Sequence, residues 1–157
     1  MVKIKIVAVG KIKEKYFLDA CQEYLKRLSR FAEVSVIEVK EENFVQTPTD
    51  AEALTIMKKE GASILKELKG AIYVTAIEGK QYSSVEFANL IKKIKDGAKE
   101  ATFVIGGSYG VDANIKSKAD GLISMSKMTF PHTLARVTLL EQIYRGFMIN
   151  ADAKYHK

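Results

Sequence analysis

The chain has 157 residues, of which 47% are apolar, and a formal net charge of +6. This length suits a single domain, 1–157, with enough apolar side chains for a sizeable core. The single cysteine, Cys21, excludes a disulfide framework and a cysteine-based zinc site, and no run approaches the roughly 18 apolar residues of a membrane helix, so we expect a cytoplasmic protein.

Residues 2–9 alternate lysine with apolar side chains, which predicts a strand rather than a signal peptide. A helix is expected over 15–29. Lys11, Lys13 and Lys15 follow the first strand, and residues 1–30 carry eight Lys or Arg against three Asp or Glu. Such a basic stretch suits contacts with RNA phosphates, although the lysines of a solvated sheet edge have the same pattern.

The rest of the chain also alternates between strand and helix patterns. Strands are predicted at 33–39, 71–77, 101–105 and 120–125, and helices at about 50–68, 84–95, 111–117 and 131–149. Thr49 and Ser83 have the residue type and position of helix caps. The alternation predicts an α/β fold whose mostly parallel sheet has helices on both faces, and generic topology favours an unknotted chain.

A glycine turn, Gly106-Gly107-Ser108-Tyr109-Gly110, follows the strand at 101–105 directly. Glycines at such a turn allow positive φ and a close approach of the backbone to a ligand. The spacing G-G-x-x-G matches neither the dinucleotide fingerprint nor a P-loop, which disfavours a Rossmann dehydrogenase and a P-loop NTPase.

A second turn, residues 126–132, separates the strand at 120–125 from the last helix. Pro131 suits a first helical turn, and Thr129 can cap the helix with its hydroxyl. The unpaired N–H groups of a first turn can bind a small ligand, but an ordinary capped helix has the same signature. We interpret His132 as a helix-start residue rather than a base.

The last helix has an unusually wide apolar surface. Its apolar residues cover an arc of roughly 220°, against the ~100° that one core face requires, and they are Leu134, Val137, Leu139, Leu140, Ile143, Tyr144, Phe147 and Met148. We therefore expect the helix to bury two sides, one of them against a partner subunit. Arg136 falls inside the arc and could form an ion pair across a dimer interface, bind RNA phosphate, or extend its head to solvent.

Four ordered motifs resemble the ribosomal large subunit methyltransferase H family. They are FVIGGSYG at 103–110, SKMTFPH at 126–132, LLEQIYRG at 139–146 and YHK at 155–157, and the resemblance extends to 9–16. It thus covers essentially the whole chain. Two departures are Gly146, where alanine is common in the family, and residues 150–154, which lack a glycine often found there.

The resemblance implies a SPOUT-class RNA methyltransferase with S-adenosyl-L-methionine as cofactor, a C-terminal trefoil knot and a homodimeric active site without a metal ion. It further implies methylation of N3 of a pseudouridine in 23S ribosomal RNA of the large ribosomal subunit, on the assembled ribosome. Residue by residue, it implies that the cofactor is bound by Thr75, Gly106, Met125, Ser126, Lys127, Met128, Thr129 and Phe130.

For catalysis the resemblance points to the end of the chain. Arg145 could stabilise an anionic uracil ring or clamp phosphate, Tyr155 could stack on the base, and His156 could take the proton. A frayed, non-catalytic tail is the alternative. Two other functions stay open: a SPOUT methyltransferase acting on another RNA, and a non-enzymatic RNA- or ribosome-binding factor that needs no cofactor.

Overall fold

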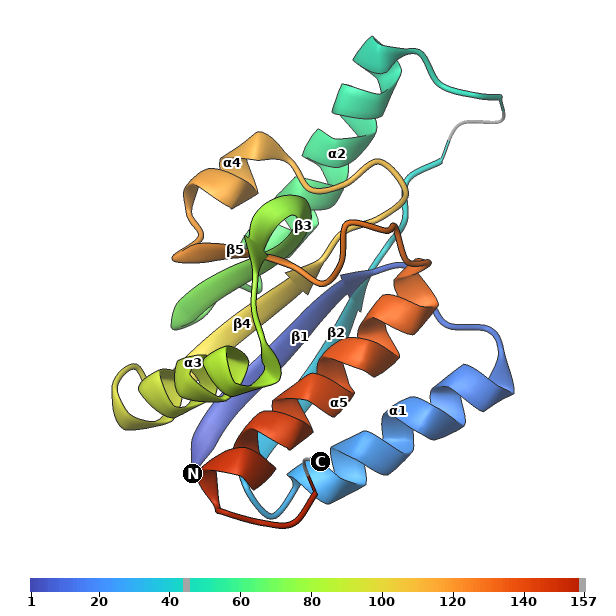
Figure 1. Ribbon diagram of the computed structural model, residues 1–157. Coiled ribbons are helices and arrows are strands. Elements are labelled where there is room, and N and C mark those ends of the chain that lie inside the picture. The colour runs from blue at the N-terminus through green and yellow to red at the C-terminus, as the bar shows by residue number, and fades with distance from the viewer. Residues whose placement is uncertain (44–45, 156–157) are drawn as a thin grey trace.

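The computed structural model describes residues 1–43 and 46–155 of the chain (Figure 1). Five strands alternate with five helices in this part of the chain. In order, these elements are β1 (Val2–Val9), α1 (Lys15–Leu28), β2 (Ala32–Val39), α2 (Asp50–Leu65), β3 (Ala71–Gln81), α3 (Ser84–Asp96), β4 (Glu100–Ile105), α4 (Ala113–Ser117), β5 (Gly121–Ser124) and α5 (His132–Asn150).

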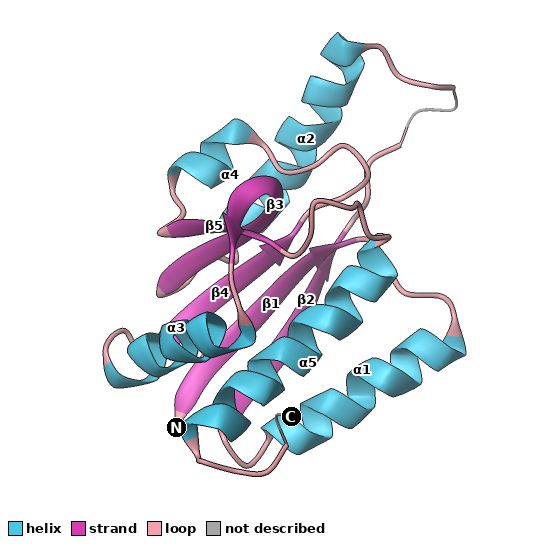
Figure 2. Cartoon of the chain, viewed as in Figure 1, coloured by secondary structure: helices cyan, strands magenta, loops and turns pink. Residues whose placement is uncertain are grey.

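The strands form one sheet in the order β2-β1-β4-β3-β5, and every neighbouring pair is parallel. Helices cover both faces of this sheet (Figure 2). The predicted α/β class with a mostly parallel sheet is therefore confirmed. Within the described residues, no helix is long and apolar enough to cross a membrane.

The two faces of the sheet carry separate cores because successive side chains of a strand point to opposite sides. Ile4 and Ile6 of β1 belong to the core beneath α1, α3 and α5. Val7 and Val9 belong to the core beneath α2 and α4. Strands buried on both faces have the nearly continuous apolar sequences seen here in β1 and β4.

Contacts within the chain account for the wide apolar arc of α5. The helix packs between α1 and α3 and lies over the sheet. Leu140 and Ile143 are completely buried, whereas Leu134 is 42% exposed. The predicted burial of two sides of the helix is confirmed, but two flanking helices and the sheet cover most of the arc, so the arc by itself does not indicate a partner subunit. The homodimer stays a prediction.

The start of α5 differs from the prediction. Pro131 is the N-cap residue, with an extended ψ of 148°, and no side chain caps the helix. The prediction that Thr129 caps α5 is wrong, because Thr129 lies two residues before the N-cap position from which a hydroxyl reaches the first-turn N–H groups. The predicted caps Thr49 and Ser83 are confirmed, each in a complete capping box.

Strand β3 continues to Gln81, four residues beyond its predicted end at 77. The reason is its pairing with β5: Ile123 is the partner of both Thr75 and Lys80. The intervening residues of β3 therefore curl over the end of β5, as the green ribbon in Figure 1 shows. Gly79 is required there, since a Cβ atom would lie 2.6 Å from the carbonyl carbon of Leu122.

Candidate functional site

A cavity of about 820 Å³ opens at the carboxyl ends of β3, β4 and β5. Three chain segments contribute to its lining. They supply residues 75–78, residues 105–111, and, from the third segment, residues 123, 125, 126, 128–132 and 135, together with Lys116. Its volume lies within the range of about 300–1,000 Å³ found for small-molecule sites, and the carboxyl edge is where parallel sheets generally bind ligands.

The glycine turn forms one wall of the cavity. A Cβ atom on Gly106 would lie 2.6 Å from Cγ2 of Val111 and 3.0 Å from the carbonyl carbon of Gly110. Gly110 has φ +92°, and its N–H donates to the Gly107 carbonyl at 3.1 Å. Glycine is therefore required at 106 by close packing and at 110 by backbone conformation.

Two serines order the loop between β5 and α5. The buried Ser124 donates its hydroxyl hydrogen to the Ser126 carbonyl at 3.1 Å. The N–H of Met128 donates to Oγ of Ser126 at 3.0 Å. These two bonds hold the 124–128 turn against the cavity. Sequence reasoning missed Ser124, since an isolated serine in a strand gives no signal of such a role.

The structure brings together seven of the eight residues predicted to bind a cofactor. Those that line the cavity are Thr75, Gly106, Met125, Ser126, Met128, Thr129 and Phe130. The eighth, Lys127, is exposed and does not line it. The hydroxyl of Thr75 donates to the Val104 carbonyl at 3.1 Å, so its side chain ties β3 to β4.

An ion pair at the cavity was not predicted from sequence. Lys116 Nζ of α4 lies 2.6 Å from Oε1 of Glu78 in the curled end of β3, and both residues line the cavity. The hydrogen bond from Lys116 lowers the pKa of Glu78. His132 and Tyr109 also line the cavity, in keeping with the interpretation of His132 as a helix-start residue.

Arg136 has none of its three predicted roles within the chain. It is 4% exposed, its Nη1 lies 2.8 Å from Oε2 of Glu38, and its Nη2 donates to the Gly10 carbonyl at 3.2 Å. Its Nε has no hydrogen-bond partner among the described residues. Arg136 thus ties the second turn of α5 to the ends of β1 and β2. Sequence reasoning missed this because Glu38 lies 98 positions away.

A buried carboxylate lies behind the glycine turn. Glu60 of α2 is 3% exposed, and its Oε2 accepts the N–H of Glu42 at 3.1 Å. A Cβ atom on Gly107 would lie 3.1 Å from Oε1 of Glu60. Burial raises the pKa of Glu60, and the charges of Glu41 and Glu42 raise it further.

Two of the predicted catalytic residues, Arg145 and Tyr155, lie toward the other end of α5. Arg145 Nη2 is 2.6 Å from Oε1 of Glu141, and its guanidinium lies 4.8 Å from the ring centre of Tyr155. The Tyr155 hydroxyl donates to the same Glu141 oxygen at 3.3 Å. Burial, followed by hydrogen bonding to Tyr24, raises the pKa of Tyr155 to about 12. His156 lies outside the described residues.

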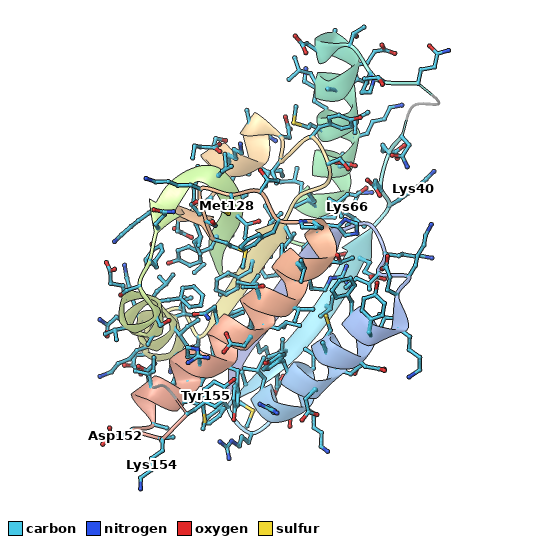
Figure 3. The ribbon with its side chains drawn as sticks, turned by 45° about the vertical axis from the view of Figure 1, so that its right-hand side comes forward. Lys40, Lys66, Met128, Asp152, Lys154 and Tyr155 are labelled. Carbon is cyan, nitrogen blue, oxygen red and sulfur yellow. The ribbon has the colours of Figure 1, made fainter. Side chains whose placement is uncertain are left out.

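Neither Arg145 nor Tyr155 lines the cavity of its own chain. At roughly 1.5 Å per helical residue, Arg145 is about 20 Å along α5 from His132 at the cavity. Met128 lines the cavity, and Figure 3 shows Tyr155 far from Met128, toward the opposite end of the helix. One chain therefore does not bring the two predicted sets of residues together. In the described part, no three His, Cys, Asp or Glu side chains could jointly hold a metal ion.

Comparisons with known proteins identify the family of the chain. A family model described as "Predicted SPOUT methyltransferase" matches residues 2–156. A Lactobacillus acidophilus protein named ribosomal RNA large subunit methyltransferase H is 52% identical over 157 residues, covering 98% of this chain and 99% of the relative. A Streptococcus uberis protein of the same name is 49% identical over 158 residues, covering 99% of each.

A solved structure also shares the fold. It is titled as a probable methylase family protein from Haemophilus influenzae Rd KW20, and it matches with a TM-score of 0.54 at 11% identity. The match covers 98% of this chain and 70% of that one.

Proposed function

The chain belongs to the SPOUT methyltransferase family, and we propose that it transfers a methyl group from S-adenosyl-L-methionine to N3 of a pseudouridine in 23S ribosomal RNA. The family resemblance of the sequence motifs is thereby confirmed. The observation that carries the proposal is the cavity formed by the glycine turn and the 125–130 loop, in a chain with full-length relatives named as large subunit methyltransferases.

The residues around the cavity fit S-adenosyl-L-methionine. Position 106 presents only backbone atoms, because any side chain there would collide with Val111 and Gly110. Met125, Met128 and Phe130 give apolar walls, and backbone groups of the 125–130 loop can bind a neutral purine. The bound cofactor supplies a methyl group that is already electrophilic because it sits on a sulfonium, so the chain needs no metal ion or covalent nucleophile.

The chain's own contribution is alignment of the acceptor nitrogen and removal of an imide proton. We assign the stabilisation of the acceptor to Arg145, stacking on the base to Tyr155, and proton transfer to His156. Because Arg145 and Tyr155 do not line the cavity of their own chain, we propose a homodimer in which the tail of one chain completes the cavity of the other.

Three further properties belong to the same proposal. The chain is a single domain over 1–157, it acts in the cytoplasm on the large subunit of assembled ribosomes, and its C-terminal part forms a trefoil knot. The pairing of Ile123 with both Thr75 and Lys80 supports the knot, since β3 there curls over the strand that leads into α5.

The two rival functions make different predictions. A SPOUT enzyme acting on another RNA would bind the same cofactor but leave ribosomes unmethylated. A non-enzymatic RNA- or ribosome-binding factor would bind RNA without any need for the cofactor, and nothing in that function requires a cavity of about 820 Å³ beside a glycine turn.

The proposal is tested by incubating the purified protein with S-adenosyl-L-methionine labelled in its methyl group and with ribosomes from a bacterium lacking this activity. We expect label in 23S RNA, recovered as 3-methylpseudouridine after digestion to nucleosides. Label in transfer RNA only would favour the first rival, and no transfer to any RNA by a protein that binds ribosomes would favour the second.

A further inference from the structure

We propose that the loop between β1 and α1, together with the first residue of α1, is a phosphate-binding surface for the RNA that enters the cavity, with Lys11, Lys13 and Lys15 as its cations. We call these three residues the lysine loop. The inference rests on the proposed RNA substrate and deepens it, since it names where the RNA backbone lies. The surface is built from exposed side chains at the same edge of the sheet as the cavity.

The local structure directs these lysines outward. Ile12 is 5% exposed and belongs to the core, so the chain is anchored between Lys11 and Lys13. Lys11 and Lys13 themselves are exposed. The loop follows the end of β1, and parallel strands place all their carboxyl ends at one edge of a sheet.

One contact joins the loop directly to the cavity wall. Nε2 of His132, which lines the cavity, lies 3.5 Å from the Lys11 carbonyl oxygen. The buried Arg136 also holds the start of this loop, because its guanidinium donates to the Gly10 carbonyl. The Lys11 end of the lysine loop is therefore held at the cavity's rim. A nucleotide that enters the cavity would bring its flanking phosphates within reach of flexible ammonium groups.

The acidic neighbours set the contribution of each lysine. Lys15 forms an exposed ion pair with Asp19 at 2.8 Å, whereas Lys11 and Lys13 form none among the described residues. Glu14 lies between Lys13 and Lys15 and is exposed. Lys15 must exchange Asp19 for phosphate, so we expect Lys13→Gln to weaken RNA binding more than Lys15→Gln does.

An exposed aromatic ring completes the surface. Tyr16 at the start of α1 is 69% exposed, and its ring centre lies 4.6 Å from that of Phe17. Aromatic rings next to basic side chains are the usual platform for unpaired bases. Tyr16→Ala should therefore weaken RNA binding without changing its dependence on salt, because stacking releases no counterions.

The test compares two triple variants with equal loss of charge. The first changes Lys11, Lys13 and Lys15 to Gln. The second changes Lys92, Lys93 and Lys95 to Gln, which are exposed on the last turns of α3 and lie at the sheet's opposite edge. Sedimentation with purified ribosomes at several KCl concentrations measures affinity, and titration of S-adenosyl-L-methionine measures the cavity separately.

We expect the lysine-loop variant to lose at least about tenfold in ribosome affinity and to lower the slope of log affinity against log salt by about two. The α3 variant should stay within about twofold of wild type, and both should bind the cofactor normally. Equal losses in the two variants, or no loss in the first, would overturn the proposal.

A further experiment distinguishes RNA from a ribosomal protein as the partner of this surface. The lysine-loop variant should also bind deproteinised 23S RNA more weakly than wild type does. If it binds this RNA as wild type does but binds ribosomes more weakly, the partner of the surface is a ribosomal protein, and the proposal is refuted. The outcome is independent of the proposed reaction. A wild-type protein that binds ribosomes through the lysine loop but transfers no methyl group would refute only the reaction.

Discussion

The buried position of Glu60 makes the stability of the folded protein depend on pH. Burial raises its pKa, so the folded protein binds this proton more tightly than the unfolded chain does. Ionised Glu60 therefore lowers stability above its folded pKa, and the loss disappears as the pH falls through that pKa toward the ordinary carboxyl value. The other carboxylates nearby, Glu41 and Glu42, act in the same direction.

We predict that Glu60→Gln raises the free energy of unfolding at pH 7 by on the order of 1 kcal/mol, because glutamine can accept the Glu42 N–H without a buried charge. The gain should shrink toward pH 5. Urea unfolding at pH 5, 6, 7 and 8 measures it. The control Glu86→Gln, at the exposed cap of α3, should show no gain. A variant less stable at pH 7 than at pH 5, relative to wild type, would contradict the prediction.

The part-buried ion pair of Arg136 with Glu38 and the exposed pair of Lys15 with Asp19 should differ in their contribution to stability. Arg136→Met leaves Glu38 and the Gly10 carbonyl without their donor, and we predict a loss of about 3 kcal/mol. Lys15→Met breaks the exposed pair with Asp19 and should change stability by less than about 0.5 kcal/mol. Denaturant unfolding of both variants at pH 7 checks this, and equal effects would be inconsistent with it.

At the scale of elements, the curled end of β3 is held by steric contact. A Cβ atom on Gly79 would lie 2.6 Å from the carbonyl carbon of Leu122 and 2.8 Å from the Ile123 nitrogen, and backbone atoms cannot rotate away. We predict that Gly79→Ala costs about 2–3 kcal/mol.

The matched control is Gly110→Ala, where a Cβ atom meets nothing within 4 Å but φ is +92°. It should cost about 1–2 kcal/mol from backbone conformation alone. Thermal and urea unfolding of both variants measure the difference. If Gly79→Ala were the less damaging of the two, the close packing of β3 on β5 would not be holding the curl in place.

The elements predicted from sequence were those with local signals. Thr49 and Ser83 have their partner acids three residues later, so both helix starts could be identified from a short stretch of chain. The extension of β3 to Gln81 could not, because residues 78–81 are polar and contain a glycine, and their pairing partner Ile123 lies more than forty positions away. The predicted cap of α5 was wrong because the backbone of Pro131 is extended, so that the helix begins only at His132.

The candidate site shows the same division. The glycine turn and the 125–130 loop could be found because their residue types and resemblance are local, and they do meet at one cavity. Glu78 and Lys116 could not, since an ion pair between the curl of β3 and α4 depends on tertiary placement. The separation of Arg145 from the cavity does follow from sequence, since the predicted helix over 131–149 already places Arg145 roughly 20 Å along the axis from His132.

At the scale of the whole molecule, the proposed homodimer predicts complementation between two inactive variants. Gly106→Ala should abolish cofactor binding, and Arg145→Ala should abolish methyl transfer while leaving cofactor binding intact. In a mixed dimer, the intact cavity of the second variant meets the intact Arg145 of the first. We therefore expect methyl transfer to ribosomes to return when the two proteins are mixed.

As the control for that experiment, the methyl transfer by each variant alone is measured at the same total protein concentration. Activity in the mixture that equals the sum of the separate activities would show that Arg145 acts on the cavity of its own chain or not at all. Size-exclusion chromatography with light scattering on the wild-type protein checks the dimer independently, and a monomeric mass would contradict it.

The most direct test of the account is isothermal titration of S-adenosyl-L-methionine into the wild-type protein, the Gly106→Ala variant and the Gly146→Ala variant. Gly106 lines the cavity, whereas Gly146 lies in α5 against Ile91 and away from it. The account predicts saturable binding by wild type and Gly146→Ala and its loss in Gly106→Ala. Folded wild-type protein that binds no cofactor, with or without ribosomes present, would contradict it.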